Sequence, residues 1–126
     1  MENNSYIIKI KANKQNILTL KPTIDSLLNQ ETEFTYKIVL VVSEKDFKNP
    51  AEFPFDIYLL YRRNKIEIMF CFDIDDEEEF IEKYLDENII EIIDVTKIYP
   101  SNYIQMYDYF KNFVLIKEQK EKESEC

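Results

Sequence analysis

Alternation of apolar and polar positions predicts two strands in the first third of the chain. Residues 6–12 place Tyr6, Ile8 and Ile10 on one side and lysines on the other, the pattern of a half-buried strand. Residues 34–42 alternate as well, but their second half is apolar on both sides. A strand of that kind is typical of the middle of a sheet, where both faces are covered.

A second alternating region predicts a β-hairpin. Residues 55–61 and 66–72 each alternate over their full length, and a short polar segment separates them. That segment contains Asn64, and Asn tolerates the positive φ that a tight turn requires. We therefore expect two antiparallel strands joined by a turn at residues 62–65.

Helical signals occur in three places. Residues 23–28 follow Pro22 and predict a short helix, and residues 100–117 predict a longer one near the end. Asp75 followed by Glu78 resembles a capping box and predicts a helix from there to about Asn88. Its predicted buried stripe consists of Phe80, Ile81, Tyr84 and Leu85. Residues 89–95 fit either a strand or a continuation of this helix.

This order of elements predicts an α+β fold. Consecutive strands without helices between them favour a small antiparallel sheet, of about four to five strands, with helices packed on one face. The expected domain comprises residues 1–116, and residues 117–126 predict a charged, flexible tail with no apolar stripe to bury.

The chain contains no glycine and no histidine. Without glycine it cannot form the glycine-rich loops that bind phosphate groups, and without histidine it cannot form serine–histidine or cysteine–histidine nucleophiles. Zinc sites that use histidine are excluded in the same way. Cys71 lies in an apolar run and Cys126 is the last residue, so a disulfide framework is not expected. We therefore predict no catalytic residue, no cofactor and no enzymatic activity.

Composition also guides the expected location of the protein. The longest aliphatic run, residues 38–42, is far shorter than the roughly 20 residues of a membrane-spanning helix. The first residues carry neither a basic region nor a long apolar region, so no secretory signal is expected. Together with the two isolated cysteines, these features predict a cytoplasmic protein that does not bind a membrane.

Negative charge is concentrated in one segment. The formal net charge is −9, and 11 of the 25 acidic residues lie between Asp73 and Asp94 together with a single base, Lys83. The remaining chain is close to neutral. Acidic residues in a first turn stabilise a helix, but repeated acids four residues apart repel one another. A solvated helix surface is one interpretation; a surface that steers a basic partner is the other.

The candidate binding residues belong to this acidic helix. They are Asp75, Asp76, Glu78, Glu79, Glu82, Asp86 and Glu87. A metal site is the competing interpretation, since Asp73, Asp75 and Glu77 match the start of a calcium-binding EF-hand loop. The match fails where that loop requires glycine and, at its twelfth position, glutamate, so no metal ligand is predicted.

Three functional hypotheses follow. The first is a non-enzymatic acidic protein that neutralises a basic protein partner, such as an immunity protein for a nuclease-type toxin or a phage-type inhibitor that mimics nucleic-acid charge. The second is a structural or adaptor subunit whose acidic helix is only solvated surface. The third is a metal-dependent enzyme that uses carboxylates. Binding to nucleic acid itself is not expected of so acidic a chain.

Overall fold

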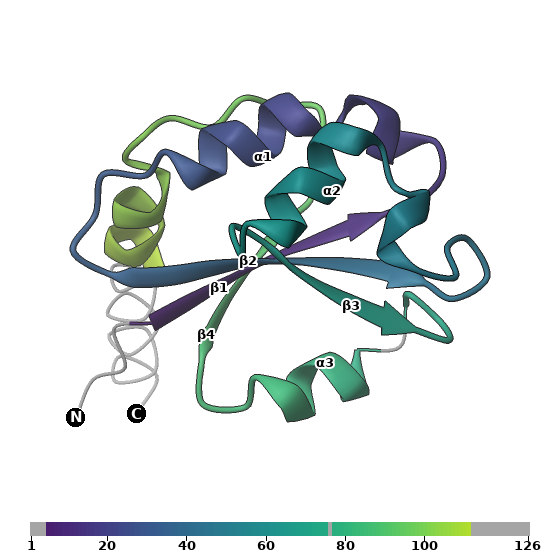
Figure 1. The fold of residues 1–126 in the computed structure, drawn as a ribbon. Coiled ribbons are helices and arrows are strands. Elements are labelled where there is room, and N and C mark those ends of the chain that lie inside the picture. The colour runs from purple at the N-terminus through teal and green to yellow at the C-terminus, as the bar shows by residue number, and fades with distance from the viewer. Residues whose placement is uncertain (1–4, 76, 112–126) are drawn as a thin grey trace.

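The computed structural model describes residues 5–75 and 77–111, which form an alternating series of strands and helices (Figure 1). The elements are β1 (Ser5–Ala12), η1 (Asn16–Thr19), α1 (Lys21–Leu28), β2 (Thr35–Ser43), η2 (Pro50–Glu52), α2 (Phe55–Arg62), β3 (Glu67–Cys71), α3 (Glu78–Lys83) and β4 (Asn88–Ile92). A further helix begins at Tyr103 and is described to residue 111. The predicted tail, residues 117–126, lies outside the described residues.

The four strands form one sheet in the order β3-β2-β1-β4, and every neighbouring pair is parallel. Ile8 of β1 lies opposite Ile38 of β2 and Ile90 of β4, which fixes the register at the centre. The predicted antiparallel α+β fold is therefore wrong: this is an alternating α/β fold with a Rossmann-like parallel sheet. Parallel neighbours need a crossover between them, and α1, α2 and α3 provide the three crossovers.

The predicted hairpin is the error that led to the wrong fold class. Residues 55–62 form helix α2 instead of a strand. Pro54 precedes the helix, Asp56 lies in its first turn and Arg62 in its last, an arrangement that favours helix ends. Ile57 is fully buried, and Leu60 and Tyr61 pack against the same core. The spacing of these three residues is helical, whereas Phe55 is exposed.

Other sequence predictions are confirmed. The strands predicted at residues 6–12 and 34–42 are β1 and β2, and β2 lies inside the sheet as its apolar pattern indicated. The short helix at residues 23–28 is part of α1. Of the ambiguous segment at residues 89–95, residues 89–92 belong to strand β4 and the rest follow it without regular structure. Cys71 is buried, as its position in an apolar run indicated.

The sheet has two unequally covered faces. Helices α1 and α2 cover one face, together with the helix that begins at Tyr103, whereas α3 is the one described helix that packs on the other (Figure 1). The first core contains Ile8, Ile10 and Ile24, and the Tyr6 hydroxyl in it donates a hydrogen bond to Asp108. The second core is smaller and forms around Val39 and Phe80. We call these sides the α1/α2 face and the α3 face.

No helix among residues 5–75 and 77–111 combines the length and the apolar character needed to cross a membrane.

Candidate functional site

Helix α3 is much shorter than the sequence predicts. It begins at Glu78 and ends at Lys83, and its N-cap position is Glu77, so Asp75 is not the N-cap. Tyr84 leaves helical geometry with φ −119°. The chain has to turn there because Asn88 begins β4 opposite Tyr6 of β1. The parallel sheet, and not local helix propensity, therefore ends the helix.

The short helix buries only one line of side chains. Phe80 and Tyr84 are 2% and 7% exposed and pack on the α3 face of the sheet. Ile81 and Leu85, predicted to be buried beside them, are 47% and 72% exposed. A single helix of less than two turns on a broad sheet presents only a narrow stripe to it, so these two residues face solvent.

Some of the acidic charge is balanced by lysines of the sheet. The Lys11 ammonium lies 3.6 Å from an Asp75 carboxylate oxygen, 3.8 Å from Glu77 and 3.4 Å from Glu91. Partial burial lowers the pKa of Lys11, but the neighbouring carboxylates, Glu91 first, outweigh that effect and raise the pKa. Asp75 thus belongs to an internal ion-pair network at the carboxyl end of β1.

Lys9 belongs to the same network and is almost fully buried. Its ammonium lies 3.7 Å from Glu77 and 4.0 Å from Glu91, and 4.7 Å from the centre of the Phe80 ring. The alternating pattern of residues 6–12 predicts Lys9 and Lys11 on the outer side of a half-buried strand and does not pair them with the acidic segment. A parallel sheet covered on both sides brings them under α3 instead.

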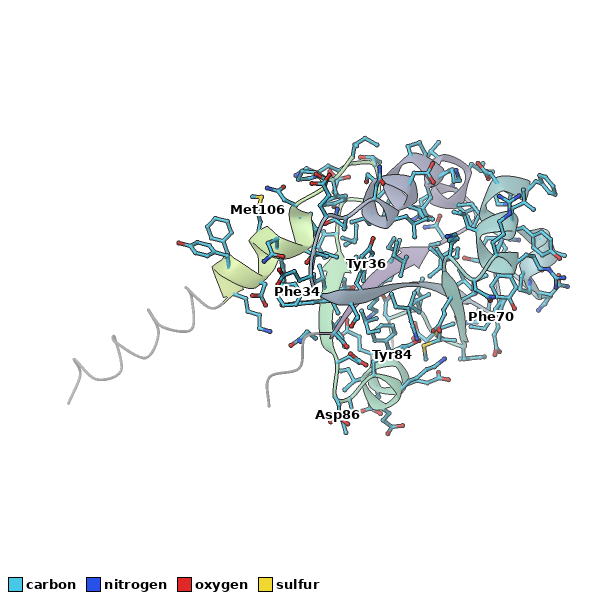
Figure 2. All side chains as sticks on the ribbon, turned by 60° about the vertical axis from the view of Figure 1, so that its left-hand side comes forward. Phe34, Tyr36, Phe70, Tyr84, Asp86 and Met106 are labelled. Carbon is cyan, nitrogen blue, oxygen red and sulfur yellow. The ribbon has the colours of Figure 1, made fainter. Side chains whose placement is uncertain are left out.

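Four of the predicted binding residues do share one exposed surface. Glu78, Glu79 and Glu82 are exposed on α3, and Asp86 is exposed in the turn that follows. Figure 2 shows Asp86 at the periphery of the molecule, while Tyr84 lies between α3 and the sheet. In the described part of the chain, no ion pair reaches the carboxylates of Glu79 or Glu82.

Ile81 is exposed on α3 between Glu78 and Glu82, and Leu85 is exposed in the turn that follows, next to Asp86. We call the set the α3 surface. It consists of Glu78, Glu79, Ile81, Glu82, Leu85 and Asp86. The two aliphatic members escaped the sequence analysis, because a long amphipathic helix was expected to bury them.

The remaining predicted residues do not join the α3 surface. Glu87 is partly buried, and its Oε2 atom is enclosed without a hydrogen-bond partner among residues 5–75 and 77–111. Glu87 lines a cavity of about 220 Å³ with Tyr84 and with residues at the amino ends of β1 and β2. Asp76 lies outside the described residues.

The carboxyl end of the sheet is where open α/β sheets usually bind ligands, at the point where the strand order reverses between β1 and β4. After β1, the Asn13 Oδ1 atom accepts hydrogen bonds from the backbone N–H groups of Gln15 and Asn16 at 2.9 and 2.8 Å. The Thr23 hydroxyl lies 2.9 Å from the carbonyl oxygen of Val95, which follows β4. The Gln15 and Asn16 N–H groups and the Thr23 hydroxyl are therefore already bonded within the chain.

Within the described residues, no cluster of three or more cysteine, aspartate or glutamate side chains has a geometry suited to a metal ion. Comparison of the chain with protein-family models, curated proteins and solved structures finds no significant match.

Proposed function

We propose that this chain is a non-enzymatic protein-binding domain that engages a basic protein partner through the α3 surface. One observation carries the proposal. Ile81 and Leu85 are exposed among carboxylates, and those of Glu79 and Glu82 have no ion pair in the described part of the chain. A helix surface adapted only to water would carry more lysines among its acids than the single Lys83, and it would not expose two large aliphatic residues together.

The two components of this surface act differently in binding. Burial of Ile81 and Leu85 against a partner contributes about 25 cal/mol for each Å² of apolar area removed from water. The carboxylates raise the rate of encounter with a positively charged protein and disfavour acidic competitors. The partner that fits best presents an apolar patch surrounded by lysine and arginine.

Proteins that grip phosphate groups carry such basic clefts, so we propose inhibition of a nuclease-type toxin or of a nucleic-acid-binding enzyme as the specific role. A row of carboxylates occupies the cleft in place of phosphates. Rapid capture is the advantage that steering gives to an inhibitor of this kind.

The proposal is tested with two charge-matched variants and one probe. The first variant is Glu79→Lys/Glu82→Lys/Asp86→Lys, on the α3 surface. The control is Glu31→Lys/Glu33→Lys/Glu44→Lys, which changes the net charge equally at exposed positions outside that surface. The probe is a synthetic peptide rich in lysine and leucine, whose association rate is measured by surface plasmon resonance at low and physiological salt.

We expect the α3 variant to associate about tenfold more slowly than wild type at low salt, and the control variant to stay within about twofold. Added salt should narrow the difference, because exposed charges are screened. If both variants associate equally slowly, only net charge matters. The hypothesis of an adaptor subunit with a solvated acidic helix would then replace this proposal.

A further inference from the structure

Strand β3 is an edge of the sheet, and its outer side is open. Among the described strands it pairs only with β2, and the Cys71 carbonyl oxygen points inward to accept a hydrogen bond of 2.9 Å from the Glu44 N–H group. Because backbone groups alternate in direction along a strand, those of Ile68 and Phe70 point outward. Among the described residues, no hydrogen bond reaches these outward groups.

A groove runs between this edge and α3. Its larger part has a volume of about 490 Å³ and is lined by Ile68, Met69, Phe70, Glu79, Glu82 and Lys83. A second hollow of about 340 Å³ continues it toward the start of β3, where Tyr61, Asn64 and Ile66 add to the lining. Ile68 and Lys83 line both hollows, so the groove follows the length of the strand.

The walls of the groove differ in chemistry. On the α3 side, Glu79 and Glu82 offer carboxylates without ion pairs in the described part of the chain, while the Lys83 ammonium lies 5.5 Å from the centre of the Tyr84 ring. On the α2 side the lining combines the apolar Tyr61 and Ile66 with Asn64, and Lys37 in the same hollow is paired with Glu67 at 3.0 Å. An extended peptide beside β3 would send alternate side chains to these two walls.

We propose that the basic partner contributes an extended segment that adds to the sheet as a fifth strand beside β3. Its basic side chains face Glu79 and Glu82, and its alternate, apolar side chains face the α2 side. The inference rests on the proposed function, because it assigns the same partner a mode of binding. Hydrogen bonds to the Ile68 and Phe70 backbone supply affinity, and the two walls supply selectivity.

A second copy of this chain is a poorer occupant of the groove. Two copies joined edge to edge through β3 would bring their own Glu79 and Glu82 side chains close together, in molecules that each carry a net charge of −9. Like charges across an interface oppose association. A basic segment of another protein meets no such repulsion.

The test uses a short capped peptide of alternating lysine and valine. Two variants of this peptide, which we call twins, carry N-methyl groups on every second backbone nitrogen. One twin is methylated on one alternating set of nitrogens and the other twin on the other set. Whatever the direction of the added strand, only one set of nitrogens faces β3, so one twin should bind about tenfold more weakly and the other should match the parent. Binding should also slow amide hydrogen exchange at Ile68 and Phe70, measured by NMR on the intact chain.

A Glu79→Lys/Glu82→Lys variant separates this inference from the proposed function. If both twins bind like the parent and only the charge reversal weakens binding, strand addition is overturned and the proposed function stands. If one twin weakens but the charge reversal changes nothing, the edge binds peptides and the acidic recognition fails. If the parent peptide does not bind, strand addition is overturned. If the amides of Ile68 and Phe70 exchange slowly in a dimer formed without peptide, a second copy of the chain occupies the groove, and this also overturns the inference.

Discussion

At the scale of single residues, Tyr84 connects the α3 surface to the sheet. Its hydroxyl donates a hydrogen bond of 3.0 Å to Oε2 of Glu67, and the Lys37 ammonium lies 3.0 Å from Oε1 of the same carboxylate. Burial, with the Glu67 contact, raises the pKa of Tyr84, so the hydroxyl remains a donor at neutral pH. Burial also pushes the pKa of Glu67 upward, but the Lys37 and Tyr84 contacts outweigh it and hold that pKa below its usual value.

Tyr84→Phe removes one donor from this carboxylate and keeps the ring. We expect the pKa of Glu67 to rise toward its ordinary value, as measured by carbon NMR titration of the side chain. A carboxylate with a depressed folded pKa stabilises the fold above its usual pKa and loses that contribution as the pH falls through the folded pKa. The variant should therefore lose about 1 kcal/mol at pH 7 and less at pH 3. A loss that is independent of pH would show that Tyr84 acts only through packing.

At the scale of elements, α2 shows why the sequence misled. Its apolar residues satisfy a period of two as well as a helical period, because residues 57, 59 and 61 alternate while residues 57, 60 and 61 share a helix face. The residue suited to positive φ was identified correctly, but its role was not. Asn64 adopts φ 59°, and it follows a helix instead of turning a hairpin. The local sequence pattern alone cannot distinguish an Asn that ends a helix from an Asn that turns a hairpin.

The end of α2 gives a direct test of that role. The Lys65 N–H group bonds to the Leu60 carbonyl oxygen at 2.9 Å and the Asn64 N–H group to that of Tyr61 at 3.1 Å, the two hydrogen bonds of a Schellman motif. Asn64→Gly should preserve or increase stability, whereas Asn64→Val should cost about 1–2 kcal/mol, because a β-branched residue disfavours positive φ. Urea denaturation measures both. Equal stability of the two variants would contradict the assignment.

The sequence predicts the part of the α3 surface that depends only on acidic residues close together in the chain. Glu78, Glu79, Glu82 and Asp86 gather on one exposed surface because they are near neighbours in the chain. Asp75 and Glu87 leave the group because the sheet, which the sequence did not predict correctly, sets where α3 begins and where β4 follows. The edge groove beside β3 could not be anticipated at all, since its strand had been assigned to a hairpin.

At the scale of the whole molecule, the two faces of the sheet differ in their charge and in how much of each is covered by helices. The α1/α2 face carries most of the helices, and the α3 face carries one short helix and the ion pairs of Lys9 and Lys11 (Figure 1). The apolar pattern on both sides of residues 38–42 already indicated a central strand. It could not indicate parallel pairing, because that depends on crossover helices far from the strand itself. The acidic excess therefore remains on the side that is least covered.

This unequal distribution predicts how salt affects stability. In Glu79→Lys/Glu82→Lys/Asp86→Lys, the Glu78–Glu82 repulsion turns into attraction and most of the acidic excess between Asp73 and Asp94 is removed. These gains should outweigh the new repulsion between position 79 and Lys83, so the melting temperature at low salt should rise by about 2 °C. The control Glu31→Lys/Glu33→Lys/Glu44→Lys has the same net charge but leaves the α3 surface acidic, so its rise should be smaller. In 0.5 M NaCl the electrostatic screening length falls to about 4 Å, so the melting temperatures of wild type and both variants should become similar. Differential scanning calorimetry measures each. An equal rise in both variants at low salt would show that the repulsion belongs to the whole molecule and is not concentrated on α3.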